Sequence, residues 1–236
     1  MLQYRVDHES KEILGNDLWR KPSDLQLPAN SYVIDLGGNT GKFAKQIKSE
    51  TNTIVSIDID RAIMVGVDGV HLPGVTPIQG NILYLPFRDN SFDVVLARAI
   101  LHHVPDNLDL AFKEIKRILK PNGQVLIEEP GALNPIAYII RKAFPTSSHE
   151  ESERPFKPSV LKEKTKMYFT INEIEYHWLL SYSLPHFISR LPNKLKPITR
   201  KLLGMLVRMD NVLLKYKTFQ PFCGYVFIKG ITIKSN

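Results

Sequence analysis

The sequence predicts an α/β fold built on a mainly parallel, doubly wound sheet. Apolar runs of strand length alternate five times with helical patterns within about a hundred residues, which is typical of parallel strands joined by right-handed crossovers. The first run leads into the glycine-rich turn of residues 37–41. The 236 residues suffice for one such domain with an appended cap.

The first half of the predicted sheet lies between residues 32 and 78. Residues 32–36 read YVIDL and form the first strand, and a short helix follows over 42–50. Residues 53–59 read TIVSIDI and predict a buried strand. A weaker strand covers 75–78, and its Pro77 places it at an edge of the sheet because proline cannot donate to the ladder.

The next pair of strands flanks the clearest helix. Residues 92–97 predict a strand, and Asp106 is a suitable N-cap for the helix that follows. The apolar residues of this helix recur at helical spacing: Leu108, Ala111, Phe112, Ile115, Ile118 and Leu119. The helix stops at the sequence PNG of residues 121–123, and a strand follows over 124–128.

The alternation loosens after Pro130. We expect a helix over 135–143, and a loop with a short helix over 149–166. Residues 174–184 alternate apolar and polar side chains and predict a strand, although a helix also fits them. A strand over 225–233 pairs with it as a C-terminal hairpin, which brings the sheet to seven strands with one of them antiparallel.

A basic amphipathic helix is predicted between the strands of this hairpin, over residues 197–216. Its apolar face comprises Ile198, Leu202, Met205, Leu206, Met209, Val212, Leu213 and Tyr216. Residues 190–217 hold eight basic side chains and one acid, so they carry the whole net charge of +7. Such a helix either covers the substrate pocket or another subunit, or contacts an anionic membrane. Nucleic acid is disfavoured because aromatic residues are not interleaved with these charges.

The overall composition is that of a globular protein, with 43% hydrophobic and 23% charged residues and a mean hydropathy of −0.15. No run of 18 apolar residues predicts a membrane span, and residues 1–10 do not resemble a secretory signal. The single cysteine, Cys223, excludes a disulfide framework and a cysteine zinc site. We therefore expect a cytoplasmic protein, with peripheral membrane contact through residues 190–217 as an extension.

The turn of residues 37–41 predicts an adenosine-containing ligand. It follows a strand that carries Asp35, and glycines there let the backbone approach a ligand closely. Asp58 ends the next strand, where a carboxylate can accept hydrogen bonds from both ribose hydroxyls. The dinucleotide pattern G-x-G-x-x-G fails, because Asn39 and Lys42 occupy glycine positions. This argues against the rival prediction of a nicotinamide-dependent oxidoreductase.

Four linked motifs resemble the class I S-adenosylmethionine-dependent methyltransferases, in particular the small-molecule group related to ubiquinone biosynthesis. They are VIDLGGNTG (33–41), SIDID (56–60), GNILYLPFRDNSFDVVLARAILHHVPD (80–106) and LKPNGQVLIEEP (119–130). The resemblance implies a Rossmann-like fold, S-adenosylmethionine as cofactor and S-adenosylhomocysteine as product. It implies no metal, and it points to methyl transfer to a small-molecule or lipid-like acceptor by a monomer or homodimer.

The resemblance also implies a role for each matched residue. Asp35 organises the turn and reaches the methionine amino group, beside the turn residues Gly37, Gly38, Asn39 and Gly41. Asp58 holds the ribose and Ile59 packs on the adenine, whose edge is addressed by Asn81 and Ile82. Ala97 and Arg98 line the methionine end of the site.

Two of these positions depart from the family pattern. Asn39 replaces a glycine, but asparagine tolerates positive φ better than other side chains. Asn81 replaces an aspartate and keeps an acceptor oxygen without the charge. If these changes abolish turnover, the chain is a binding protein that has kept the methyltransferase fold.

Candidates for a general base lie past the fourth and fifth strands. His102 and His103 follow the fourth strand, and Glu128 and Glu129 end the fifth. All of them fall at the carboxyl edge of the sheet, where open α/β sheets bind ligands. His102, His103 and Glu128 are the catalytic candidates, with loop packing as the alternative role.

The chain is thus divided into four parts by expected function. Residues 1–30 form an N-terminal helical lid, and 31–130 form the cofactor-binding core. Residues 131–170 form a substrate cap, and 171–236 complete the sheet around the inserted helix 197–216.

Overall fold

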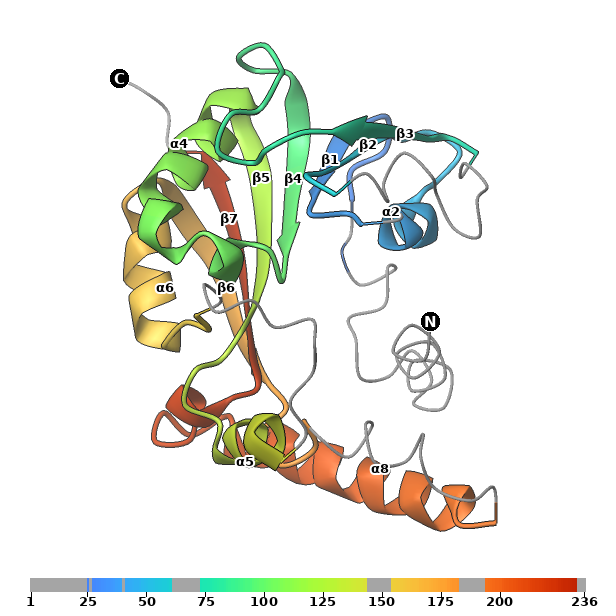
Figure 1. Ribbon diagram of the computed structural model, residues 1–236, viewed down its shortest axis with the longest axis vertical. Helices are drawn as coiled ribbons and strands as arrows, with labels where there is room; N and C mark the ends of the chain where they lie inside the picture. The colour runs from blue at the N-terminus through green and yellow to red at the C-terminus, as the bar shows by residue number, and fades with distance from the viewer. Residues whose placement is uncertain are drawn as a thin grey trace. The chain divides into compact units, whose positions relative to one another are not determined.

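The computed structural model describes residues 25, 27–39, 41–60, 73–143, 154–182 and 194–232 (Figure 1). Its seven-stranded sheet has the order β3-β2-β1-β4-β5-β7-β6, which confirms the predicted fold class. Most of the predicted lid, residues 1–24, lies outside the described residues.

Four parallel pairings build the cofactor half of the sheet. β1 (Tyr32–Leu36) lies between β2 (Thr53–Asp58) and β4 (Phe92–Arg98). β3 (Val75–Gln79) pairs only with β2 and is the edge strand that Pro77 predicts. β5 (Leu119–Pro130) pairs with β4. The carboxyl ends of β1, β2 and β4 therefore meet at one edge of the sheet.

The helix after β4 starts differently from the prediction. Two short 3₁₀ turns, Leu101–His103 and Pro105–Asn107, precede α4 (Leu108–Ile118). Asn107 occupies the N-cap position and makes no side-chain cap hydrogen bond, so the prediction of Asp106 as N-cap is wrong. The 3₁₀ turn places Asp106 one residue too early to cap the helix. The predicted apolar face of α4 is confirmed, since its members are buried.

β5 begins earlier than the sequence predicts. Leu119 pairs with Phe92 directly after α4, and the register then shifts before Val94 pairs with Gln124. The PNG sequence lies within this irregularity, where Asn122 has a φ of 63°. The turn residues therefore form a bulge inside the strand.

The sixth strand is also displaced from its predicted position. β6 covers Phe169–His177, so the predicted strand 174–184 is wrong for residues 178–182, and its last two residues lie outside the described ranges. The alternative helix is wrong for residues 171–177. Two facts explain the shift. Phe169 is buried against Phe112, with ring centroids 6.0 Å apart, which anchors the strand early. Trp178 has a φ of 60°, which ends the extended conformation.

The C-terminal hairpin is completed by β7 (Tyr225–Thr232), which lies between β5 and β6. Figure 1 shows β7 running opposite to β4, so it supplies the predicted antiparallel strand. The other α-helices in the described part of the chain are α2 (Lys42–Ile47), α5 (Pro135–Ala143), α6 (Pro158–Lys166) and α8 (Lys196–Leu213). Within the described ranges, no helix has both the length and the apolarity needed to cross a membrane.

The chain divides into two compact units. The core unit comprises 26–130, 150–175 and 226–236, and holds nearly the whole sheet with α2, α4 and α6. The second unit comprises 1–25, 131–149 and 176–225, and holds α5 and α8. The functional division into lid, core and cap stays a prediction.

Buried polar side chains hold the second unit together. Asn134 Oδ1 accepts a hydrogen bond from the Ala137 N–H, and Asn134 Nδ2 donates to carbonyl oxygens of Trp178, Leu179 and Phe222. Asn134 therefore caps α5 and joins it to two distant segments of the chain.

Candidate cofactor site

The turn after β1 brings the backbone close to a possible ligand. Gly37 and Gly41 have φ values of 70° and 77°, and Asn39 has a φ of 49°. A Cβ on Gly37 would lie 2.6 Å from the Ile100 side chain, and one on Gly38 would overlap Ser56 Oγ. A larger side chain would clash at both positions, so both require glycine. Asn39 adopts the left-handed conformation that we expected of it, so the turn survives its departure from the family pattern.

Asp58 connects the turn to the end of β2. One carboxylate oxygen accepts a hydrogen bond from the Asn39 N–H at 2.7 Å, and the other accepts from the Asp60 N–H at 2.9 Å. Each oxygen keeps a second lone pair, so the oriented carboxylate can also accept hydrogen bonds from two adjacent hydroxyl groups. This geometry fits the ribose role implied by the resemblance.

Asp35 is a buried carboxylate with little hydrogen bonding. It is 2% exposed, and the Ser56 hydroxyl donates a hydrogen bond to it at 3.5 Å. Burial raises the pKa of Asp35 to about 7, against the opposing charge of Arg98. A buried carboxyl group with a raised pKa gains an ionic partner when a cationic group binds beside it. The S-adenosylmethionine ammonium is such a group, so the residues present fit this cofactor.

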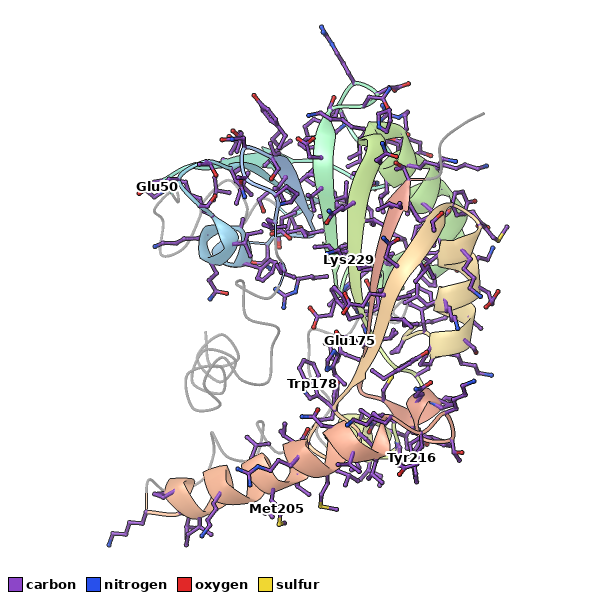
Figure 2. All side chains as sticks on the ribbon, turned by 180° about the vertical axis from the view of Figure 1, so that it is seen from behind. Glu50, Glu175, Trp178, Met205, Tyr216 and Lys229 are labelled. Atoms are coloured by element: carbon purple, nitrogen blue, oxygen red, sulfur yellow. The ribbon has the colours of Figure 1, made fainter. Side chains whose placement is uncertain are left out.

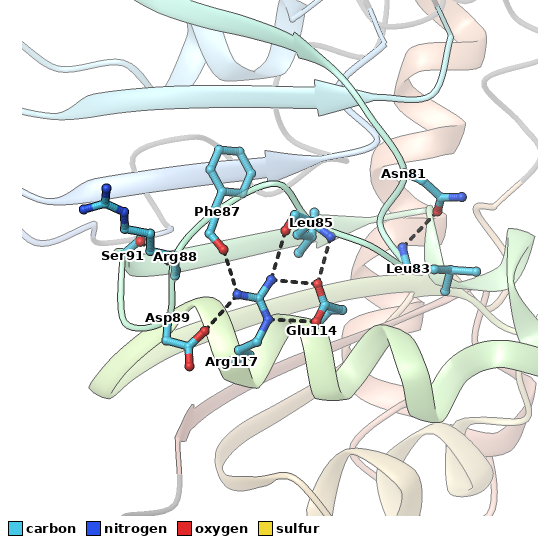
Figure 3. Close-up of polar contacts among 9 residues, drawn as sticks. All are labelled: Asn81, Leu83, Leu85, Phe87, Arg88, Asp89, Ser91, Glu114 and Arg117. Atoms are coloured by element: carbon cyan, nitrogen blue, oxygen red, sulfur yellow. Dashed lines mark hydrogen bonds and ion pairs between the residues drawn. The ribbon is translucent and has the colours of Figure 1, made fainter.

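The segment after β3 lies beside the same site. The Gly80 N–H donates to the Asp58 carbonyl oxygen at 2.8 Å, which ties residues 80–82 to the end of β2. Asn81 Oδ1 accepts a hydrogen bond from the Leu83 N–H at 2.9 Å and therefore shapes the next turn (Figure 3). Ile82 is buried, whereas Ile59 is 69% exposed. An exposed isoleucine next to Asp58 offers an apolar surface on which an adenine ring can pack.

Arg117 holds the loop that follows Asn81, which the sequence analysis missed. Its guanidinium donates to the carbonyl oxygens of Leu85 and Phe87 and to the carboxylates of Asp89 and Glu114 (Figure 3). Glu114 in turn accepts a hydrogen bond from the Leu85 N–H at 2.8 Å. The Arg117 hydrogen bond lowers the pKa of Glu114. The Glu114–Arg117 spacing of three residues on a helix is the signal that could have indicated this pair.

Arg98 occupies the end of β4 between two partners. Its Nε donates to Glu128 Oε2 at 2.8 Å, and its guanidinium carbon lies 3.7 Å from the centroid of the Phe43 ring. Glu128 is thereby engaged in an ion pair. Ala97 is fully buried, backbone included, so it lies beneath the surface of the site. Phe43, on α2, is a neighbour of the site that sequence reasoning did not identify.

His102 is paired with Glu129 and not with Glu128. Glu129 is fully buried; Oε1 accepts hydrogen bonds from the Ile100 and Leu101 N–H groups, and Oε2 lies 2.8 Å from His102 Nδ1. The His103 ring packs on His102 with centroids 4.3 Å apart. Because Ile100 also borders Gly37, this cluster is continuous with the glycine turn.

The geometry therefore brings the predicted cofactor residues to one edge of the core unit. In the described ranges, no cluster of His, Cys, Asp and Glu side chains could hold a metal ion.

Comparisons with known proteins agree with this arrangement. Residues 34–127 match a family described as "Methyltransferase domain". The ubiquinone/menaquinone biosynthesis C-methyltransferase UbiE of Haemophilus ducreyi is 39% identical over 105 residues, covering 41% of this chain and 40% of that protein. The demethylmenaquinone methyltransferase of Lactobacillus johnsonii is 34% identical over 130 residues, covering 50% of this chain and 52% of that protein.

The fold likeness extends further along the chain. A SAM-dependent methyltransferase from Methanosarcina mazei superposes with a TM-score of 0.59 at 19% identity, covering 89% of this chain and 95% of that one. The sequence matches, by contrast, span about half the length of the curated relatives. The matched residues hold the glycine turn, Asp58, Asn81 and β4. Residues 34–127 thus match a methyltransferase domain, and the chain has a fold like that of solved S-adenosylmethionine-dependent methyltransferases.

Proposed function

We propose that this protein transfers the methyl group of S-adenosylmethionine to a quinone-like, lipid-like acceptor. Asp35, the glycine turn and Asp58 lie together at one edge of the sheet, and Asp58 accepts a hydrogen bond from the turn. This observation supports the proposal most. A nicotinamide cofactor fits less well, because the turn lacks the glycine pattern of a pyrophosphate site.

Each residue has a defined task in binding. Asp35 would accept the ammonium, Asp58 the ribose hydroxyls, and Ile59 and Asn81 would contact the adenine. Arg98, held by Glu128 and Phe43, would border the methionine end. The bound cofactor supplies a methyl group on a sulfonium, already activated for displacement. The protein then has to align the acceptor and exclude water.

His102 is the residue best placed to take a proton from the acceptor. Glu129 Oε2 lies 2.8 Å from His102 Nδ1 and would accept its proton, an arrangement that leaves Nε2 as the basic nitrogen. Removing a proton from a hydroquinone hydroxyl makes the ring a stronger carbon nucleophile. His103 would support the orientation of His102 by ring packing. Glu128, paired with Arg98, remains a secondary candidate for the base.

The acceptor class is inferred from the relatives, whose names specify ubiquinone or menaquinone biosynthesis and demethylmenaquinone. Such acceptors combine a redox-active ring with an apolar tail. We further infer that the protein works as a monomer or homodimer in the cytoplasm, in peripheral contact with an anionic membrane through residues 190–217.

Calorimetric titration with S-adenosylmethionine, S-adenosylhomocysteine and NADH tests the cofactor. We expect micromolar binding of the first two and none of NADH. Asp58→Ala should weaken binding by about 1.5 to 3 kcal/mol, the range for hydrogen bonds to a charged group. Asp60→Ala is the matched control, since Asp60 donates to Asp58 through its backbone N–H, which alanine keeps. Equal affinity in the Asp58 variant and the wild type would overturn the ribose assignment.

The acceptor is tested by transfer of labelled methyl from S-adenosylmethionine to a short-chain demethylmenaquinol, with a simple phenol and a fatty acid in parallel. Labelling of the quinol carbon alone supports the proposal. Cofactor binding with no transfer to any of the three would support the alternative, a binding protein without turnover.

A further inference from the structure

An exposed apolar stripe runs along α8 and the turn after it. Its members are Ile198, Leu202, Met205, Met209, Val212 and Tyr216, and each is between 42% and 68% exposed. They recur at alternating intervals of four and three residues, which places them on one helical face. Figure 2 shows the Met205 side chain projecting outward from α8. The surface of a soluble protein rarely exposes a continuous apolar stripe of this kind unless it binds a partner.

The stripe is separate from the face by which α8 packs in its own unit. Leu203, Asp210 and Leu214 are buried. The Asp210 carboxylate accepts hydrogen bonds from the Leu180 and Ser181 N–H groups and from Ser181 Oγ at 2.6 Å to 3.0 Å. Leu206 and Leu213, predicted on the apolar face, are half-buried beside this packing face. The rotation of α8 about its axis is thus fixed by Asp210.

A row of positive charge borders the stripe on the side away from the packing face. Lys201, Arg208 and Lys215 are exposed and follow one another at intervals of seven residues, which is close to two helical turns. Asp210 is the single acid in residues 194–217, and it is buried. The exposed surface of α8 therefore combines apolar and positive side chains with no negative charge.

We propose that α8 lies flat on an anionic lipid surface, with the Ile198–Tyr216 stripe in the headgroup region and Lys201, Arg208 and Lys215 against lipid phosphates. Helices that lie at membrane interfaces combine an apolar face with basic residues, because burial of the apolar face and attraction to anionic lipid both strengthen binding. A second copy of the chain fits less well, since two such surfaces face to face would bring basic rows together. The connection between this lipid-binding surface and a lipid-like acceptor rests on the proposed function.

The charge contribution is tested by flotation of the full chain with vesicles of 70% phosphatidylcholine and 30% phosphatidylglycerol, against phosphatidylcholine alone. The variant Lys201→Gln, Arg208→Gln, Lys215→Gln should bind the anionic vesicles about a hundredfold more weakly, at about fivefold per charge. The matched control, Arg88→Gln, Lys113→Gln, Lys157→Gln, removes three exposed charges outside α8 and should stay within about twofold of the wild type. Equal losses in both variants, or equal binding to both vesicle types, would overturn the proposal.

The orientation of the helix is tested with a fluorescent probe on cysteine. The native Cys223 is fully buried, and burial raises the pKa of its thiol to about 12, so it should resist labelling. A polarity-sensitive probe on Met205→Cys should shift to the blue when anionic vesicles are added. The same probe on Asn211→Cys lies about 120° away around the helix and should stay at its aqueous wavelength.

Other outcomes of the probe experiment count against membrane docking. Shifts at both positions, or at neither, contradict a helix lying on one face. A blue shift at Met205 without vesicles, rising with protein concentration together with a dimer in sedimentation, would identify a second copy as the partner. Vesicle binding needs no methyl transfer. The vesicle test can therefore succeed where the acceptor assay fails, and the acceptor assay can succeed where the vesicle test fails.

Discussion

Single residues set the chemistry of the site through their burial and their partners. Asp35 shows this most clearly, because one buried carboxylate couples stability, pH and ligand binding. Its pKa of about 7 means that the folded protein holds this proton more tightly than the unfolded chain does. The stability that Asp35 contributes is therefore fully present below about pH 4 and is lost as the pH rises through 7.

Asp35→Asn should stabilise the protein without ligand at pH 8 relative to the wild type, and much less at pH 4. The difference has an upper limit of about 4 kcal/mol, because the asparagine carries no charge to desolvate. Thermal unfolding of both proteins across this range is the measurement. A stability difference independent of pH would contradict the assignment of the raised pKa to Asp35.

The same variant should bind S-adenosylmethionine about tenfold to a hundredfold more weakly, since the ammonium loses an ionic partner. In the wild type, affinity should increase as the pH rises through 7. Calorimetry below pH 7 in two buffers of different ionisation enthalpy should show proton release on binding, and the variant should show none.

Glu129→Gln tests the role of Glu129 as a positioning residue for His102. A glutamine Oε1 can still accept the Ile100 and Leu101 N–H groups, but its Nε2 would donate to His102 Nδ1 and place the ring proton on Nε2. We expect kcat to fall about a hundredfold or more, with KM and cofactor affinity nearly unchanged. Partial recovery with Glu129→Asp would support positioning, whereas equal loss of kcat and of thermal stability in both variants would indicate a structural role only.

At the scale of elements, the ends of strands and helices place the site. β1, β2 and β4 deliver Asp35, Asp58 and Arg98 to one edge because they are parallel and in register. α4 contributes through Arg117, whose hydrogen bonds hold the loop after Asn81. The loop has no regular structure of its own, so the Arg117 side chain contributes to its order together with the Leu85 N–H bond to Glu114.

Arg117→Lys should lower the free energy of unfolding by about 1 to 2 kcal/mol, because lysine cannot replace the planar set of donors. Amide hydrogen exchange should accelerate in residues 83–91, and Lys113→Gln on the same helix should leave exchange there unchanged. Protection of the loop equal to that of the wild type would show that other contacts hold it.

At the scale of the whole molecule, the proposed cofactor site and the proposed membrane-binding surface lie in different units. The core unit contains every predicted cofactor residue, and the second unit contains α8 and its apolar stripe. Asp210 stabilises the second unit by orienting α8 against residues 180–181.

Asp210→Ala should lower stability by about 2 to 3 kcal/mol, since it leaves buried donors without an acceptor. Cofactor affinity should stay within about twofold, because the core unit holds the cofactor residues. Calorimetric unfolding with and without S-adenosylhomocysteine measures both, and Asn211→Ala, an exposed neighbour, is the control. A large loss of cofactor affinity in the Asp210 variant would show that the two units are coupled.

The sequence alone determined the fold class and most strand positions, and it predicted the cofactor residues. These depend on local pattern: periodicity identifies strands and helices, and a glycine turn between strand and helix needs particular residues at fixed spacing. The prediction from the sequence misplaced β6 and the N-cap of α4. Those depend on Phe169 packing on Phe112 and on the 3₁₀ turn before Leu108, neither of which leaves a periodic signal.

Only the tertiary structure decided which carboxylates serve which partners. In the sequence Glu128 and Glu129 are equivalent neighbours, but adjacent strand residues point to opposite faces, so one meets Arg98 and the other His102. The same holds for α8, whose apolar residues form one group in the sequence. Asp210 fixes the helix rotation, and this divides them into a packing face and an exposed stripe, because only three-dimensional contacts determine which side of a helix is covered.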